Sequence, residues 1–430
     1  MKQAVLAALL ILAITGEAGW AASLPGESGP AADSSRTFWA DQRASGAVRL
    51  NYFRSSRELD DAMNFLGTTA QIKLLPTLGD DLEGKLEARL TNPYVDGNGK
   101  NRGTILEGYL TWHIGKADLR AGRQIVPWGR ADGVNPTDNL TPRDFKVLLP
   151  FEEDQRVGLT ALKLDYALTP EYTLTAFTTP FFEPAKLPGA SAASVEKRPA
   201  RSLADSTLAL KLDKTGGALD WSLSYFHGYS TLPGARLLGT GPDGPLLELR
   251  YDKIDVIGAD FARNFGRYGV RGELAYYFTG DRDGRDPAVK NPYLYYVLGG
   301  DRTFFDNLNV NLQLVGRWVN RYTDPAAIAD PLARQVAIQN AITAGQQDRA
   351  SYGLSSRISN KWFNDTLEAE LLVFANFTRR NAYLRPLLSY AFSDQVKGSI
   401  GAEIYTGAEE TAFGRLKRNR GVFAELRYSY

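Results

Sequence analysis

The chain has 430 residues, with 50 lysines and arginines against 49 acidic residues and a formal net charge of +1 at pH 7. This balance, with no basic tract among the aromatic residues, argues against a nucleic-acid partner, and the lack of cysteine excludes disulfides, thiolate metal sites and cysteine nucleophiles. His113 and His227 are the only histidines, which excludes a histidine-rich metal site, while 41 glycines, 21 tyrosines and 20 phenylalanines favour strands and turns over helices.

The first 21 residues have the features of an export signal. Lys2 supplies a positive charge, residues 4–14 form an apolar run, and Gly19 and Ala21 are the small residues of a cleavage site. The apolar run is shorter than the roughly 20 residues that a membrane-spanning helix needs. We therefore expect cleavage after Ala21, followed by a periplasmic N-terminal tail at 22–46 and a barrel at 47–430.

From about residue 48 the sequence alternates apolar and polar residues. In residues 82–90, LEGKLEARL, three leucines and two small residues share one face, and two glutamates, a lysine and an arginine share the other. Most later segments repeat this pattern, so each strand has one charged face and one thin apolar face. That arrangement is typical of a transmembrane antiparallel β-barrel, with lipid outside and water inside. Opposite charges on neighbouring strands are expected to pair across the lumen wall.

The segments number 18, and the chain is therefore predicted to be all-β with about 18 strands. We place them at residues 47–55, 62–76, 81–92, 103–115, 117–127, 155–167, 171–179, 204–213, 217–229, 246–264, 267–280, 291–301, 307–323, 350–360, 365–378, 382–392, 395–407 and 418–430. Short turns alternate with connections that include long loops at 93–102, 128–154, 180–203, 230–245, 281–290 and 324–349. Short periplasmic turns and longer outer loops are typical of outer-membrane barrels.

The C-terminal residues GVFAELRYSY place Leu426, Tyr428 and Tyr430 on one face. This ending resembles the C-terminal assembly signal of bacterial outer-membrane proteins. The resemblance implies that the chain is inserted by the outer-membrane assembly machinery and resides in the bacterial outer membrane.

The segment GRQIVPWGRADGVNPTDNLTPRDF, residues 122–145, ends the fifth strand and fills most of the longest outer loop. Alternation from Leu119 and Ala121 would point Arg123 at lipid, so we predict a β-bulge at Gly122 that turns Arg123 into the lumen. Trp128 is expected near the membrane surface, where tryptophan is favoured.

We expect this loop to fold into the pore, where its arginines would donate to a solute and its aspartates would hold the arginines in place. The candidate pore residues are Arg120, Arg123, Arg130, Asp132, Asn135, Asp138, Arg143 and Asp144. The alternative is a structural latch, in which the same pairs pin the loop to the barrel wall and touch no solute. The sequence leaves both interpretations open.

The same stretch, LRAGRQ followed by WGRADG, NPTD and PRD, resembles a segment of several proteobacterial outer-membrane barrels. In those proteins a strand ending in Gly-Arg-Gln runs into Trp-Gly and then into Asn-Pro with an acidic residue. Alginate-export porins share the Gly-Arg-Gln ending. The resemblance implies a Gram-negative porin-type barrel. An alginate exporter would have a strongly arginine-lined lumen, whereas the charges expected here are mixed: Glu83, Lys85, Glu87, Arg89, Arg271, Glu273, Glu368, Glu370, Lys397, Glu403, Glu425 and Arg427.

Residues 324–345 contain the one helix predicted after the signal, with Asp330 as its cap and Pro331 in its first turn. It lies in an outer loop, where it either plugs the mouth or rests on the rim. His113 is expected to face water in the lumen near the periplasmic end. Since no nucleophile, phosphate-binding or metal-ligand motif occurs, we predict no catalytic residue, no metal and no cofactor.

The sequence therefore predicts an outer-membrane channel for passive passage of small solutes, constricted by the 128–154 loop. Expected partners are outer-membrane lipid, small solutes and the assembly machinery, with a second copy of the chain or a periplasmic protein as further candidates. The first alternative is an export barrel, or one that transports lipids or hydrophobic compounds, working with a periplasmic or inner-membrane partner. Apolar patches in the lumen would favour it. A barrel enzyme and a structural barrel with a blocked lumen are the remaining alternatives.

Overall fold

The computed structural model describes residues 43–55, 64–92, 101–147, 149, 151–187, 194–241 and 244–430. The predicted export signal (1–21), the tail as far as residue 42 and most of the 93–102 loop lie outside these residues. The first strand begins at Arg43 rather than at residue 47. Among the described helices, none has the length and apolar composition required to cross a membrane.

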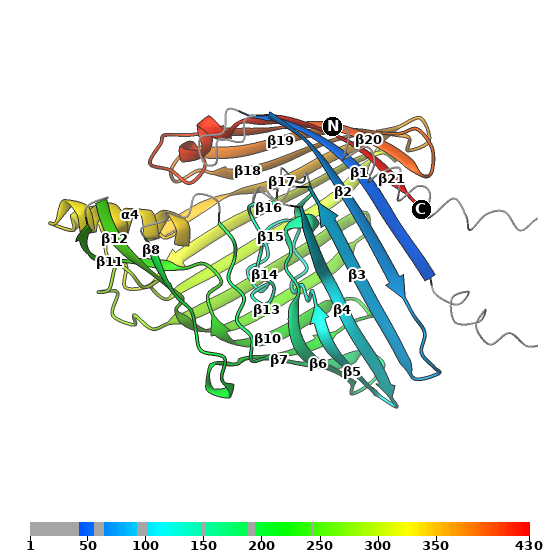
Figure 1. Cartoon of the computed structure of the whole chain (residues 1–430), viewed down its shortest axis with the longest axis horizontal. Helices are drawn as coiled ribbons and strands as arrows, with labels where there is room; N and C mark the ends of the chain where they lie inside the picture. Colours follow the sequence, from blue (N-terminus) through cyan, green and yellow to red (C-terminus); the bar gives the residue numbers. More distant parts are fainter. Residues whose placement is uncertain are drawn as a thin grey trace, which may run out of the picture.

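Eighteen antiparallel strands form one closed sheet, in which β1 pairs with both β2 and the last strand, β21 (Figure 1). The predicted fold class and the strand count are confirmed. The barrel strands are β1 (Arg43–Ser55), β2 (Asn64–Leu75), β3 (Leu82–Thr91), β4 (Arg102–Ile114), β5 (Ala117–Gln124), β6 (Leu159–Ala167), β7 (Tyr172–Thr179), β9 (Thr207–Lys214), β10 (Asp220–Tyr229), β13 (Lys253–Phe265), β14 (Tyr268–Thr279), β15 (Tyr293–Phe304), β16 (Leu308–Val319), β17 (Ala350–Trp362), β18 (Leu367–Asn376), β19 (Asn381–Ala391), β20 (Val396–Thr406) and β21 (Gly421–Ser429).

The two faces of each strand differ as the period-two pattern predicts. On β4, Trp112 has 54% of its surface exposed on the outside of the barrel, whereas Thr111 and Glu107 on the inward face are each 7% exposed. Leu110 and Ile114 continue the outer apolar row. A soluble barrel would bury such a row, so the outer face is suited to lipid.

The predicted bulge at Gly122 is wrong. β5 pairs with β4 and with β6 through Gly122 without a shift in register, and Arg123 stays on the outer face with Ala121. The extra residue is instead Leu106 of β4. Its neighbours Glu107 and Ile105 pair with Glu87 and Ala88, which are consecutive on β3. Arg123 therefore lies outside the lumen, where its Nε donates a hydrogen bond to the carbonyl oxygen of Ile105 at 2.8 Å.

The long loops carry a second, smaller sheet and a helix at one end of the barrel, to the left in Figure 1. The sheet contains β8 (Ser194–Lys197), β11 (Gly234–Gly241) and β12 (Gly244–Arg250). The segment predicted as one strand at 246–264 is divided at residues 251–252 between β12 and β13. The predicted helix is present as α4 (Pro331–Ala344), and its cap is Asp330, which accepts a hydrogen bond from the Ala333 amide. Short 3₁₀ helices occupy Glu152–Gln155, Leu203–Asp205, Pro325–Ala327 and Gly414–Asn419.

Candidate functional site

The connection between β5 and β6, residues 125–158, folds into the lumen (Figure 1). Its first half contacts β9, β13, β14, β16 and β17, and its second half contacts β1 and β3. These strands lie on different sides of the barrel. The loop therefore crosses the lumen rather than covering the mouth.

Glu273 on β14 is the anchor for the first half of the loop. Its side chain is buried, and its Oε1 accepts hydrogen bonds from the backbone amides of Arg130 and Ala131, both at 2.6 Å. The Nδ2 of Asn135 and the Oγ1 of Thr137 donate to the same carboxylate at 3.1 and 3.0 Å. Because hydrogen bonds to an ionised acceptor are stronger than neutral ones, this carboxylate holds residues 130–137 against the wall.

Arg130 extends the same anchor to two further strands. Its guanidinium forms an ion pair with Asp260 on β13, and its Nη2 lies 3.0 Å from Oδ1 of Asp213 on β9. The Ser222 hydroxyl donates to Asp260 as well. Both carboxylates on the wall are thus neutralised by the loop arginine, which leaves Arg130 little capacity for a solute anion.

Asp132 connects the loop to strands β16 and β17 of the wall. Its carboxylate accepts a hydrogen bond from Nε of Arg357 on β17 at 3.0 Å, and Arg357 also binds Glu370 on β18 at 2.8 Å. With its amide oriented to match its neighbours, Gln313 on β16 bonds the backbone nitrogen and oxygen of Asp132, both at 2.8 Å. The turn around Asp132 is therefore fixed by both backbone and side-chain contacts.

Asp138, Arg143 and Asp144 make their ion pairs within and between loops. Arg156 Nη1 lies 2.9 Å from Asp138, and Arg143 pairs with Glu152. Burial raises the pKa of the Asp138 carboxyl, although Arg156 and a backbone amide favour its charged form. Lys186, in the next long loop, lies 2.7 Å from Asp144.

The far end of the loop is anchored at Asp154. Its carboxylate accepts hydrogen bonds from both terminal nitrogens of Arg49 on β1, at 2.8 and 2.9 Å, and from Arg89 on β3 at 3.1 Å. Arg49 also donates to Glu425 on β21, at 2.9 and 2.7 Å. Of these four residues, Arg89 and Glu425 were predicted as lumen residues, whereas Arg49 and Asp154 were not. Arg49 could have been predicted, because it alternates with the apolar residues Val48 and Leu50 on a strand. Asp154 lies in a loop, where no alternation indicates which way a side chain points.

Part of the lumen wall is apolar, which the sequence analysis did not predict. Trp128 and Leu140 of the loop are 5% and 2% exposed, and they pack against inward-facing residues of β6 to β16. We call this set the luminal apolar cluster: Val126, Trp128, Leu140, Leu159, Ala161, Phe177, Ala209, Phe226, Ile254, Val256, Ala275, Tyr277, Tyr293 and Val319. The expectation that Trp128 lies at the membrane surface is therefore wrong, because the loop carries it inward to pack against the wall.

Two polar cavities lie inside the barrel, one beside the loop and one on the wall away from it. One, of about 100 Å³, is bounded by Glu152–Gln155 and strands β17–β20, and the other, of about 150 Å³, lies against β3–β6. The first is lined by Phe151, Glu152, Glu153, Arg357, Glu368, Glu370, Arg385, Leu387, Ser389 and Lys397. The second includes Glu83, Lys85, His113, Asp118, Arg120 and Asp165. Both have mixed charge.

The structure thus divides the eight predicted pore residues into three groups. Six are in the luminal loop and have protein partners: Arg130, Asp132, Asn135, Asp138, Arg143 and Asp144. Arg120 lies apart on the wall, 4.4 Å from the centre of the Tyr109 ring, and Arg123 lies on the outer face. Among the described residues, no group of three or more histidines and acids is arranged to hold a metal ion.

Comparison with other proteins gives one family and a set of shared folds. Residues 32–414 match the model of a family described as a protein of unknown function (DUF1302). No curated protein sequence matches the chain. The outer membrane protein OpdK of Pseudomonas aeruginosa is 9% identical with a TM-score of 0.55, over 91% of this chain and 99% of that one. OccD3 (OpdP) of Pseudomonas aeruginosa is 12% identical with a TM-score of 0.53, over 90% and 91% of the two chains. OccAB4 of Acinetobacter baumannii is 8% identical with a TM-score of 0.52, over 91% and 98%. At these identities the likeness is one of fold.

Proposed function

The chain belongs to the protein family of unknown function DUF1302, and we propose that it is an outer-membrane channel through which small solutes diffuse passively, constricted by the 128–154 loop. The observation that carries this proposal is the position of the loop, which crosses the lumen between Glu273 on one side and Arg49 on the other. Outer-membrane lipid, small solutes and the assembly machinery are the partners of such a channel. The fold shared with the outer membrane protein OpdK supports the location.

The mechanism has no chemical step. Selectivity in such a channel comes from its radius and from the charges that line it. The two polar cavities in the barrel carry both signs, for example Arg385 with Glu370 and Lys85 with Glu83. We therefore propose a narrow channel with weak preference between cations and anions, in which the loop acts mainly as a fixed size filter.

Single-channel recording in a planar bilayer tests this function. We expect small, steady current steps for the native protein and larger or less steady steps for Glu273→Gln, because the amide cannot accept all the hydrogen bonds that the carboxylate accepts. Glu83→Gln is the matched control, because this substitution removes the same charge from the lumen. The Glu83 side chain is 59% exposed and lies away from the loop. Silence from both the native protein and Glu273→Gln, with the barrel folded, would contradict a channel.

One observation favours a second candidate function, the transport of hydrophobic compounds with a periplasmic or inner-membrane partner. The luminal apolar cluster covers part of the wall from β6 to β16, where Trp128 and Leu140 of the loop pack over it, whereas a purely aqueous channel needs polar side chains. The test is uptake of the neutral apolar fluorophore N-phenylnaphthylamine by intact cells that express the protein. Trp128→Ala should lower this uptake without lowering ion conductance if apolar solutes follow the cluster. Equal uptake by cells that express the native protein and cells that express Trp128→Ala would exclude transport of apolar solutes along the cluster.

A further inference from the structure

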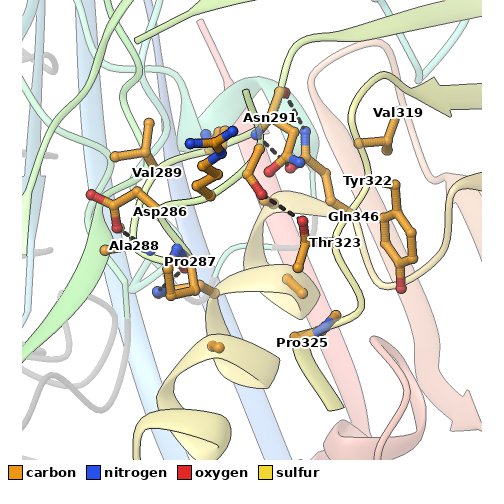
Figure 2. Close-up of a pocket in the computed structure, with 18 of the residues that line it drawn as sticks. Asp286, Pro287, Ala288, Val289, Asn291, Val319, Tyr322, Thr323, Pro325 and Gln346 are labelled. Carbon is orange, nitrogen blue, oxygen red and sulfur yellow. Dashed lines mark hydrogen bonds between the residues drawn. The ribbon is translucent and has the colours of Figure 1, made fainter. Parts of the chain in front are cut away.

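A cavity of about 170 Å³ lies under α4, at the end of the barrel where the long loops meet (Figure 2). Its walls come from separate segments of the chain: residues 233–234, residues 284–291, Val319, residues 322–328, and the inner face of α4 with Gln346. None of these residues belongs to the luminal loop. Val319 also belongs to the luminal apolar cluster, so the bottom of this cavity adjoins that cluster.

Hydrogen bonds between the segments hold the walls in place. Asn340 of α4 donates to the carbonyl oxygens of Ala235 and Pro287 at 2.7 and 3.0 Å. Gln346 accepts from the backbone amide of Asn291 at 3.0 Å and donates to its carbonyl oxygen at 2.9 Å, as the dashed lines in Figure 2 show. These bonds join three loops around the cavity.

Apart from the exposed Arg285, the polar side chains around the cavity are paired with protein groups. Thr323 donates to the Gly284 carbonyl oxygen at 2.5 Å, and the Tyr322 hydroxyl donates to Gln347 at 2.7 Å. Asp286 accepts from Arg236 at 2.5 Å. The ammonium group of Lys290 donates to Ser230 at 2.5 Å, and burial lowers its pKa to about 8.

The side chains that remain to contact a ligand are mainly apolar. They include Val289, Val319, Pro325, Ile328, Ala337 and Ala341. Binding by such a surface gives affinity through burial of apolar area, and a charged group placed against these side chains would lose its hydration without gaining a partner. An apolar cavity of about 150 Å³ is large enough for one benzene molecule.

We propose that this cavity is a binding site for a small uncharged apolar compound of about one six-membered ring. The site is preformed and lies at the outer mouth, so it captures its ligand before the constriction is reached. It does not depend on the proposed channel activity, because the ligand would bind whether or not solutes pass the loop.

Methyl NMR of the detergent-solubilised barrel, titrated with fluorobenzene, tests the proposal. We expect saturable shifts of the Ile328 and Ala337 methyl groups. Ala341→Leu, which fills the cavity from α4, should weaken binding at least tenfold. Gln335→Leu is the matched control, because Gln335 is exposed and does not line the cavity. It should bind as the native protein does.

A second variant keeps the test decisive if Ala341→Leu does not fold. Ile328→Ala enlarges the same cavity and should admit naphthalene, which the native site excludes by size. A circular dichroism spectrum equal to that of the native barrel would show that each variant is folded. The proposal fails if fluorobenzene gives only non-saturating shifts of outward-facing methyl groups, which indicates partition into the detergent. It also fails if Ala341→Leu leaves the saturable shifts unchanged.

Discussion

Arg49 and Asp154 form a two-pronged ion pair inside the barrel, with Nη1 and Nη2 of Arg49 lying 2.8 and 2.9 Å from the two carboxylate oxygens of Asp154. Arg49 belongs to β1, and Asp154 lies near the end of the luminal loop. Since Glu273 holds the beginning of the loop on β14, the two anchors stabilise the loop at both ends.

Asp154→Asn should release the far end of the loop. Removing one partner from a largely buried ion pair costs about 3–5 kcal/mol, and Asp154 serves both Arg49 and Arg89. We expect current traces with more frequent fluctuations in single-channel recordings. Glu153→Gln is the control, because it removes the same charge from the same segment at an exposed residue. Identical traces from the two variants would show that the Arg49 pair does not restrain the loop.

Deletion of residues 130–144 should enlarge the pore. The deletion removes the contacts to Glu273, Asp260 and Arg357 while β5 and β6 remain joined. We expect current steps severalfold larger than native and passage of larger neutral polymers in a polymer-exclusion measurement. Deletion of α4 residues 331–344 is the comparison, because it shortens an outer loop that does not enter the constriction. If both deletions change the exclusion limit equally, the loop is not the size filter.

Gly129→Ala should loosen the loop more than a glycine replacement elsewhere. Gly129 has φ +96°, and a methyl group there would collide with the carboxylate of Glu273. Gly216 has φ +91° but open space around it, so Gly216→Ala shares the backbone strain, at least about 1 kcal/mol, without the collision. We expect altered single-channel current only for Gly129→Ala. Chemical unfolding in detergent should show a loss of stability for both variants, and a larger loss for Gly129→Ala. An equal loss in the two variants would argue against the collision with Glu273.

The stability of the outer loops should depend on pH through Lys290. Burial lowers its folded-state pKa from 10.5 to about 8, so the folded protein releases this proton first. The free energy of unfolding should therefore rise between about pH 8 and pH 10.5, where the unfolded state still binds the proton. Lys290→Met should remove this rise in unfolding experiments across that range. Lys417→Met, at an exposed loop residue, should keep it. A rise of the same size in Lys290→Met would assign it to other groups.

The strands could be predicted from sequence because the lipid outside and the water inside impose period two along most of their length. Leu110 and Trp112 face outward and Thr111 faces inward, as the alternation requires. Simple alternation also places Arg123 on the outer face, as observed, and the error was the predicted bulge at Gly122, since the irregular residue is Leu106 on the neighbouring strand. Alternation alone does not indicate which of two paired strands carries an extra residue.

The luminal loop was recognised as a segment, but its contacts could not be derived from spacing. Arg130 lies 130 residues from Asp260 along the chain, and Asp132 lies 225 residues from Arg357. Such pairs depend on closure of the barrel, which no local pattern encodes. Trp128 shows the same limit, since its place in the luminal apolar cluster depends on residues contributed by strands from β6 to β16.

Arg49 binds two carboxylates from distant parts of the chain, which constrains when its contacts can form. Its guanidinium binds Glu425 on the last strand and Asp154 in the loop, so the complete arrangement requires β21 to have reached β1. Glu273 likewise enters the chain more than a hundred residues after the loop that it binds. The complete set of loop contacts can therefore form only once the chain has been synthesised to its last strand and β21 has reached β1.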